Sequence, residues 1–272
     1  FHSNDGFEVK SLTPVDDKSF KAVIHVPESC SLGEHIVQVR AKSGITEYRS
    51  FWVGLLPVVD EAEPNGMLEE AQAVEWNTTV HGVVESEDLD IYAVDAKQGD
   101  RISVEIEGLR LGSYRFDPHI SIIDANKFQL AAADDSPAVL QDGVISVLAP
   151  EDGRYYVQVR ESSYGGDGNS RYRLHVGNFP RPTSVYPAGG KAGEKLTVTF
   201  LGDARGPLER EIEVATEGLG ADGDEMLLLA SDDAGTCPAT LPFRISSLGN
   251  VLEAEPNNEI AQATSGDVAM AF

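Results

Sequence analysis

The chain has 272 residues and carries 21 Lys and Arg against 45 Asp and Glu, which gives a formal charge of -24 and a pI near 4.4. So acidic a surface repels phosphate backbones and anionic lipids, which excludes nucleic acid as a partner and favours cations. No apolar run approaches the roughly 20 residues of a membrane span, so no membrane insertion is expected.

The sequence begins with Phe1 rather than Met and stops shortly after a repeated acidic segment. We therefore expect it to be part of a longer polypeptide, so the missing leader says nothing about secretion. Two cysteines, Cys30 and Cys237, lie in different segments without metal-ligand spacing. We expect both to be unpaired, with a bridge between modules as the alternative.

Short runs rich in β-branched and aromatic residues follow one another along the chain, separated by turns rich in Gly, Pro, Asp and Asn. They include FKAVIHV, EHIVQVRA, RISVEIEG, HISIID, RYYVQVRE, RYRLHVG and KLTVTFLG. These runs predict an all-β protein made of β-sandwiches. One helix-like patch, MLEEAQAV at residues 67–74, is long enough for a turn or two of helix.

An internal repeat organises the chain. The pentapeptide EAEPN occupies residues 61–65 and returns 192 positions later at residues 253–257. At that offset FWVGLLPVVDEAEPN lies over FRISSLGNVLEAEPN, and Phe51 falls on Phe243. A strand end, a linker and an acidic start are duplicated together, which predicts an alternating array of two module types.

Two known families share motifs with these modules. Residues 61–177 contain, in order, EAEPN, AQAV, TVHGVVESEDLDIYAVDAKQGDRISVEI, DPHISIIDANKFQLAAADDS and DGRYYVQVRE. With these motifs the segment resembles the bacterial pre-peptidase C-terminal (PPC) domain, a jelly-roll-like β-sandwich of secreted bacterial proteins that include peptidases and clostridial collagenases. The segment RPTSVYPAGGKAGEKLTVTFLG is similar to the opening of an immunoglobulin-like IPT/TIG module. The alternation resembles large extracellular proteins of planctomycete-type bacteria.

The repeat and the two resemblances together predict the domain boundaries. The segments are the C-terminal part of an Ig-like module at 1–56, an acidic linker at 57–66, a PPC-like β-sandwich at 61–177, a second Ig-like module at 180–247 and the start of a second PPC-like repeat at 253–272. The linker and the sandwich overlap because the pentapeptide belongs to both.

The pentapeptide places oxygen-bearing side chains at alternate positions. In an extended chain Glu61 and Glu63 point to the same side with tips about 7 Å apart, and Asn65 adds an amide oxygen. Pro64 fixes its own φ and biases Glu63 toward extended geometry. The three side chains resemble half of a calcium shell, since calcium takes roughly 6 to 8 oxygens. Solvated surface charge is the alternative interpretation.

The PPC family supplies the other half of the shell from an acidic turn before a D-x-D-x-Y strand. The resemblance carries the calcium ligands onto Glu61, Glu63, Asn65, Glu87 and Asp90, with Asp88 as a possible substitute. Where the family often has Asn or Asp after the first Asn, this chain has Gly66, which offers only its carbonyl. The second pentapeptide has no acidic turn after it in this chain, so we expect no complete site there.

Catalytic motifs do not stand out. The six histidines are scattered without HExxH spacing, there is no G-x-S-x-G elbow, and no Cys has a His next to it. Among the many acids, no pair is singled out for glycoside hydrolysis. We therefore expect a protein that is not an enzyme, with structural Ca2+ and no other cofactor.

Two functions remain, and the first is a calcium-rigidified spacer between the neighbouring domains of the same extracellular polypeptide. The second is binding of a polysaccharide or a collagen-like protein, attached to a peptidase or another hydrolase. Exposed aromatic rings would distinguish the binder. The candidate rings are Trp76, Tyr114, Tyr164 and Tyr172. The PPC resemblance implies a secreted, periplasmic or cell-surface location.

Overall fold

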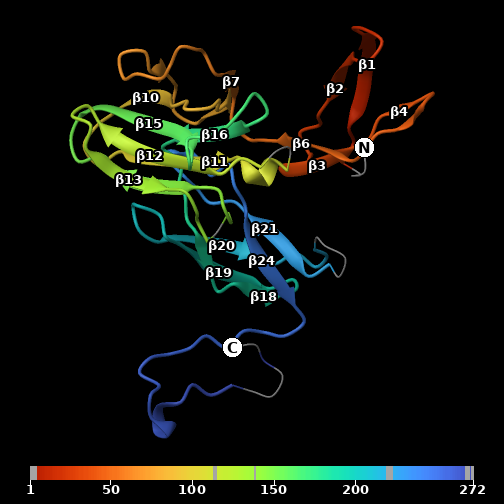
Figure 1. The fold of residues 1–272 in the computed structure, drawn as a ribbon. Coiled ribbons are helices and arrows are strands. Elements are labelled where there is room, and N and C mark those ends of the chain that lie inside the picture. The colour runs from red at the N-terminus through yellow and green to blue at the C-terminus, as the bar shows by residue number, and fades with distance from the viewer. Residues whose placement is uncertain (1–4, 113–114, 138, 219–222, 267–269, 271–272) are drawn as a thin grey trace.

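The computed structural model describes residues 5–112, 115–137, 139–218, 223–266 and 270, and it consists almost entirely of strands and turns (Figure 1). The helical elements in those ranges are two single turns, η1 (Leu109–Leu111) and η2 (Ile260–Gln262). The expected all-β sandwich class is confirmed. In the part of the chain that is described, no helix has the length and apolar character needed to cross a membrane.

A sandwich of two five-stranded sheets forms the centre of the molecule (Figure 1). One sheet has the strand order β13-β12-β15-β10-β8, and the other has the order β14-β11-β16-β9-β7. The strands of the first sheet are β8 (Gln72–Ala73), β10 (Asp90–Ala96), β12 (Pro118–Asp124), β13 (Gln129–Ala133) and β15 (Gly153–Glu161). The strands of the second sheet are β7 (Val58–Asp60), β9 (Thr78–Val83), β11 (Arg101–Glu107), β14 (Val144–Leu148) and β16 (Arg171–Gly177).

The core lies between these sheets and follows from the alternation of side chains along each strand. Tyr155, Val157 and Val159 of β15 are at most 1% exposed, whereas Tyr156 and Gln158 between them are only partly buried. Apolar residues of β9, β11 and β16 meet them from the other sheet. Period-two patterns in the sequence therefore become the two inner faces of the sandwich.

The expected helical turns at residues 67–74 are absent, so that prediction is wrong. The segment makes one hydrogen-bonded turn, from Glu70 N to Met67 O at 3.0 Å, and then becomes the edge strand β8. Gln72 of β8 lies opposite Tyr92 of β10, and its side chain accepts a hydrogen bond from the linker amide of Ala62 at 2.8 Å. Pairing with a sheet edge and with the linker outweighs the helical propensity of so short a patch.

A second, separate core belongs to the strands that follow the central sandwich. Its strands are β17 (Ser184–Tyr186), β18 (Gly189–Lys191), β19 (Lys195–Leu201), β20 (Leu208–Glu213), β21 (Glu225–Leu228), β22 (Ser231–Asp232), β23 (Gly235–Thr236) and β24 (Leu241–Ser246). They form the sheets β17-β19-β20 and β18-β24-β21 and the small pair β22-β23. Val198, Phe200 and Phe243 fill the space between the two larger sheets and are at most 1% exposed.

The first strands of the chain are much less buried. They are β1 (Glu8–Pro14), β2 (Phe20–His25), β3 (Gly33–Val37), β4 (Arg40–Ala41), β5 (Gly44–Ile45) and β6 (Arg49–Val53). Every residue of β1 and β2 is exposed, and this hairpin projects from the molecule in Figure 1. Strands β3 to β6 and β21 to β24 follow the same order at nearly the 192-residue offset of the repeat.

A buried ionic network joins the central sandwich to the strands that follow it. Arg101 of β11, which is 1% exposed, donates to Asp203 Oδ1 at 2.8 Å and to Asp232 Oδ2 at 2.7 Å. Arg181, in the connection before β17, donates through Nε to Glu105 Oε2 of β11 at 2.5 Å. Burial would raise the pKa of Glu105, but the charges of nearby arginines outweigh burial and lower it to about 2. The contact between Arg181 and Glu105 is therefore a buried ion pair.

Candidate functional site

The acidic linker is part of the central sandwich and not a free tether. Strand β7 pairs in parallel with β9, and Asp60 lies opposite His81. The pairing continues into the pentapeptide, where Glu61 N donates to His81 O at 2.9 Å. Glu61 Oε2 then accepts a hydrogen bond from the backbone amide of Val83 at 2.8 Å. Strand pairing thus places the Glu61 carboxylate at the end of the sandwich, beside β9.

Internal hydrogen bonds fix the shape of the pentapeptide. The backbone amide of Asn65 donates to Glu63 Oε2 at 2.9 Å, and Asn65 Nδ2 donates to Glu61 Oε1 at 3.3 Å. The Glu63–Pro64 bond is cis. Asn65 is fully buried, and its carbonyl accepts from the amide of Ile91 at 3.1 Å. The pentapeptide is therefore anchored to the beginning of β10.

Strand β10 begins with Asp90, whose side chain points toward the carboxylates of Glu61 and Glu63. Asp90 is fully buried, and its Oδ2 accepts a hydrogen bond from the Tyr172 hydroxyl of β16 at 2.6 Å. That hydroxyl is also hydrogen-bonded to the hydroxyl of Tyr92, and both lie 3.5 Å from Glu61 Oε1. The hydroxyls of the two tyrosines thus lie beside the carboxylates of Glu61 and Asp90. We call this group of oxygen atoms, together with those of Glu63 and Asn65, the oxygen pocket.

The arrangement brings three carboxylates together. Glu61, Glu63 and Asp90 each offer one oxygen, and these oxygens lie within 4.8 Å of one another. Two buried side-chain oxygens in this cluster, Asn65 Oδ1 and Asp90 Oδ1, have no hydrogen-bond partner among the described residues. Buried oxygens without a donor are costly. Carboxylate and amide oxygens grouped in this way are the ligand types that hard cations such as calcium take.

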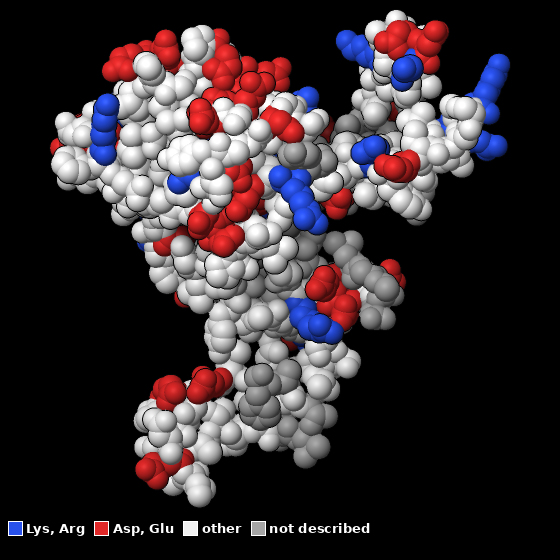
Figure 2. Space-filling view, viewed as in Figure 1, with Lys and Arg blue, Asp and Glu red and all other residues white. Residues whose placement is uncertain are grey.

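The pKa values of two acidic side chains at the site are raised. Burial, and then the charges of Asp88 and Glu61, raise the pKa of Glu63, although the Asn65 amide opposes the shift. Burial, and then the charge of Glu61, raise the pKa of Asp90 well above its usual range. Acidic side chains also gather on the surface over the loops around β7 and β10 (Figure 2). A divalent cation would offset both the burial and the repulsion that cause these shifts.

The structure separates the six expected calcium ligands into two groups. Glu61, Glu63 and Asp90 share the carboxylate cluster with the Asn65 amide, whereas Glu87 and Asp88 lie outside it among the described residues. The oxygens of Asp88 instead accept from the backbone amides of Glu85 at 3.1 Å and Leu89 at 2.9 Å. Glu87 is exposed at the tip of the turn, with a φ of 61°. Asp88 therefore stabilises the turn that precedes Asp90.

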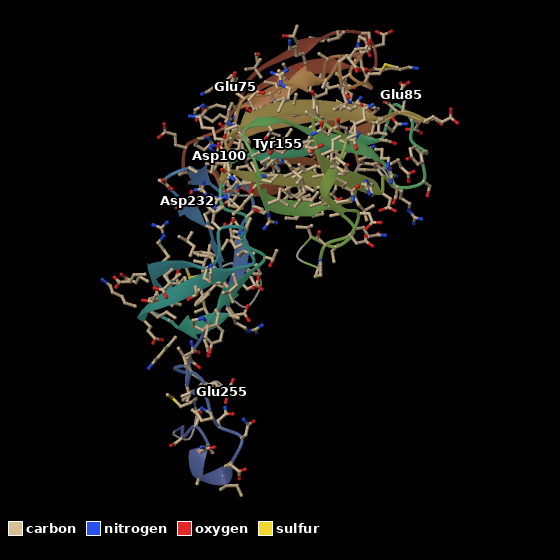
Figure 3. The ribbon with its side chains drawn as sticks, turned by 90° about the vertical axis from the view of Figure 1, so that its left-hand side faces the viewer. Glu75, Glu85, Asp100, Tyr155, Asp232 and Glu255 are labelled. Atoms are coloured by element: carbon tan, nitrogen blue, oxygen red, sulfur yellow. The ribbon has the colours of Figure 1, made fainter. Side chains whose placement is uncertain are left out.

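The second pentapeptide has the same local geometry without the surrounding pocket. Asn257 donates through its amide to Glu255 Oε2 at 2.9 Å and through Nδ2 to Glu253 Oε1 at 2.5 Å. The Glu255–Pro256 bond is also cis. Glu255 lies far from the central sandwich in Figure 3, and both glutamates are exposed. The local fold thus belongs to the pentapeptide itself, while the pocket requires β10 and β16.

The three candidate aromatic rings in the described part of the chain differ in their exposure. Tyr172 is 1% exposed because it belongs to the oxygen pocket, so its assignment as a surface ring is wrong. Trp76 is half-buried against the core of the sandwich. Tyr164 is 56% exposed, with the Arg160 guanidinium 4.5 Å from the centre of its ring. Tyr114 lies outside the described residues.

Sequence reasoning missed the two tyrosine hydroxyls. Tyr92 lies two residues after Asp90 on β10, so both side chains point to the same face of the strand. That spacing could have identified Tyr92 as a neighbour of the acid. The contribution of Tyr172 depends on the position of β16 in the opposite sheet, which no local pattern reveals.

Comparison with known proteins identifies part of the central sandwich. Residues 88–161 match the family model of the bacterial pre-peptidase C-terminal domain, which confirms a PPC domain in this part of the chain. The match does not extend to the flanking segments, so the IPT/TIG resemblance and the planctomycete-type context stay predictions. No curated protein sequence matches the chain.

Several solved structures are distantly similar to the chain. The pre-peptidase C-terminal domain of a Bacillus anthracis collagenase is 17% identical, with a TM-score of 0.29, and the match covers 43% of this chain and 98% of that one. PliG of Aeromonas hydrophila, a periplasmic inhibitor of g-type lysozyme, is 16% identical, with a TM-score of 0.30 and coverages of 45% and 96%. A Clostridium perfringens ZmpB structure with an M60 catalytic domain and two CBM51 domains is 12% identical, with a TM-score of 0.24 and coverages of 88% and 28%.

Proposed function

We propose that this chain, with its PPC domain, is a non-catalytic accessory region of a larger secreted or surface protein. In this role a calcium-stabilised sandwich holds the neighbouring domains of the same polypeptide at a fixed spacing and angle. Calcium has a structural task and no reaction to catalyse. PPC domains are modules of extracellular and periplasmic bacterial proteins, which supports the location.

The observation that carries the proposal is a pair of buried oxygens, Asn65 Oδ1 and Asp90 Oδ1, that accept no hydrogen bond from the part of the chain that the structure describes. They lie beside the carboxylates of Glu61 and Glu63, so hard oxygen ligands come from two segments that are distant in sequence. The donor set fits calcium, which prefers carboxylate and amide oxygens and accepts waters to complete its shell. An ion there would fasten the linker to β10.

The contacts at each end of the sandwich support the spacer role. The acidic turn that contains Glu85 lies at one end, whereas Asp100 and Asp232 lie near the ionic junction at the other (Figure 3). The linker would be held by the ion at the first end. Arg101 and Arg181 hold the following strands at the second. A module fixed at both junctions transmits orientation, which a flexible tether does not.

A matched pair of variants tests the site. Glu61→Gln removes a carboxylate from the pocket, and Glu253→Gln makes the same change in the same pentapeptide where the pocket is missing. We expect calcium at about 100 times its Kd to stabilise the wild type by about 2.7 kcal/mol. This gain should be lost in the Glu61 variant and kept in the Glu253 variant, as measured by thermal melts with calcium or with a calcium-selective chelator. Equal responses in both variants would contradict the assignment.

A retention assay tests the alternative function, which is binding of a polymer. Retention of the protein on insoluble polysaccharides or collagen, abolished by Tyr164→Ala, would overturn the spacer role in favour of recognition. Tyr164 is the suitable probe because its ring is the exposed one among the described candidates. The spacer account expects no retention on either material.

A further inference from the structure

Three side chains with metal-binding chemistry converge near the start of the chain, far from the calcium site in sequence. Asp5 precedes β1, Cys30 lies in the loop between β2 and β3, and His35 belongs to β3. Each offers one ligand atom, and these atoms lie within 4.8 Å of one another. Cys30 and Cys237 are both free, so neither thiol is used in a disulfide.

Packing and hydrogen bonds hold the histidine in place. His35 is 4% exposed, and its ring packs edge-on against Phe7, with the ring centres 4.8 Å apart. Its Nδ1 lies 3.3 Å from Asp5 Oδ2, and its Nε2 lies 3.6 Å from Cys30 Sγ. Ser31 orients the carboxylate, since its hydroxyl donates to Asp5 Oδ1 at 2.9 Å.

We propose that Cys30 Sγ and His35 Nε2 bind a divalent ion of the zinc class, while Asp5 beside Nδ1 orients the imidazole. Thiolate sulfur, imidazole nitrogen and carboxylate oxygen are the ligands that zinc takes, whereas calcium takes oxygen alone. In a tetrahedral zinc site, neighbouring ligand atoms are separated by about 3.3 to 3.7 Å. The 3.6 Å between Cys30 Sγ and His35 Nε2 matches such an edge. The remaining positions of the tetrahedron would be open to water.

A nucleophilic cysteine is the competing use of these groups, and the hydrogen bonds disfavour it. Cys30 Sγ donates to the Ser31 carbonyl at 3.3 Å, and His35 Nε2 contacts that same carbonyl at 2.8 Å. The nitrogen nearest the thiol is therefore occupied as a donor and cannot act as its base. A metal ion would instead replace the proton on each of the two ligand atoms.

An ion would supply stability that this part of the chain lacks. The described residues before Gly54 contain no fully buried apolar side chain, and His35 is their one buried residue. The cluster joins the segment before β1, the loop after β2, and β3. Ligand binding that connects three segments contributes directly to folding free energy, as in small metal-stabilised domains.

Cobalt(II) provides the test, because a thiolate-to-cobalt charge-transfer band reports sulfur ligation directly. We expect the untagged, reduced chain to show this band, saturating at one equivalent of cobalt and lost on addition of zinc, with no response to excess calcium. Absence of the band at saturating cobalt would overturn the proposal.

Variants identify the ligands. Cys30→Ser should abolish the band, and Asp5→Asn should weaken cobalt affinity at least tenfold. Cys237→Ser, which changes the other cysteine, should leave both unchanged. Calcium binding at the proposed site around Glu61 and Asp90 should persist in all three variants. This binding serves as the control that the rest of the chain is folded. A band that survives Cys30→Ser, or that disappears with Cys237→Ser, would contradict the assignment.

Discussion

Replacing Asp90 by Asn is expected to stabilise the calcium-free protein and to abolish most of its response to calcium. Asparagine keeps an oxygen that accepts from the Tyr172 hydroxyl, but unlike Asp90 it needs no bound proton to be neutral beside Glu61. Asparagine therefore avoids the free-energy cost of protonating a buried carboxyl when no ion is present. Removing an anionic ligand should also weaken calcium binding at least tenfold. The calcium-free and calcium-bound stabilities should therefore change in opposite directions.

The same substitution should remove a pH dependence of the calcium-free protein. Burial, and then the Glu61 charge, raise the pKa of Asp90 to about 9. An acid whose folded pKa is raised contributes most stability below its unfolded pKa of about 3.9 and loses it as pH rises through the folded value. The calcium-free wild type should thus lose up to about 1.4 kcal/mol per pH unit between roughly pH 4 and pH 9.

Urea denaturation in a calcium-selective chelator, measured across that pH range, checks both statements. Asp95→Asn is the matched control, since it makes the same change on the same strand at an exposed position. It should leave the calcium response and the slope unchanged. An Asp90 variant that keeps the full calcium response would show that Asp90 is not a ligand.

Replacing Arg101 by Met should separate the unfolding of the central sandwich from that of the following strands. Arg101 donates to both Asp203 and Asp232, and the Asp203 side chain is only 3% exposed. Removing one partner of a buried ion pair leaves an uncompensated charge and costs about 3 to 5 kcal/mol. We expect differential scanning calorimetry to resolve two transitions where the wild type shows one.

Two further variants test whether the unpaired charge at this junction causes the loss of stability. Adding Asp203→Asn to the Arg101 variant removes the stranded charge and should restore part of the lost stability. Arg154→Met breaks an ion pair with Asp95 on the exposed surface, and it should leave the transitions unchanged. A single, unshifted transition in the Arg101 variant would mean that the ionic junction does not couple the modules.

Local patterns predicted the strands well, because each strand carries its own signal. RYYVQVRE and RISVEIEG alternate with period two, and they became β15 and β11 with one face in the core. The helical patch at residues 67–74 failed because the pairing of Gln72 with β10 is a long-range contact. Tertiary pairing overrides weak helix propensity in so short a segment.

The candidate site was predictable only to the level of segments. The pentapeptide and the acidic turn identified Glu61, Glu63, Asn65 and Asp90, which do meet in the structure. The same turn could not show that Asp90 points inward while Glu87 stays exposed, because φ and register at the turn decide it. The role of Tyr172 likewise depends on which strand of the opposite sheet lies beside β9.

The most direct measurement is a crystal structure of the chain grown in calcium, with anomalous scattering to locate the ion. The account predicts one peak about 2.4 Å from oxygens of Glu61, Glu63 and Asp90 and from Asn65 Oδ1. Water would occupy the remaining positions, and the second pentapeptide would show no peak. Saturating calcium without density between the linker and β10, or an ion bound elsewhere while these oxygens stay apart, would contradict the central claim.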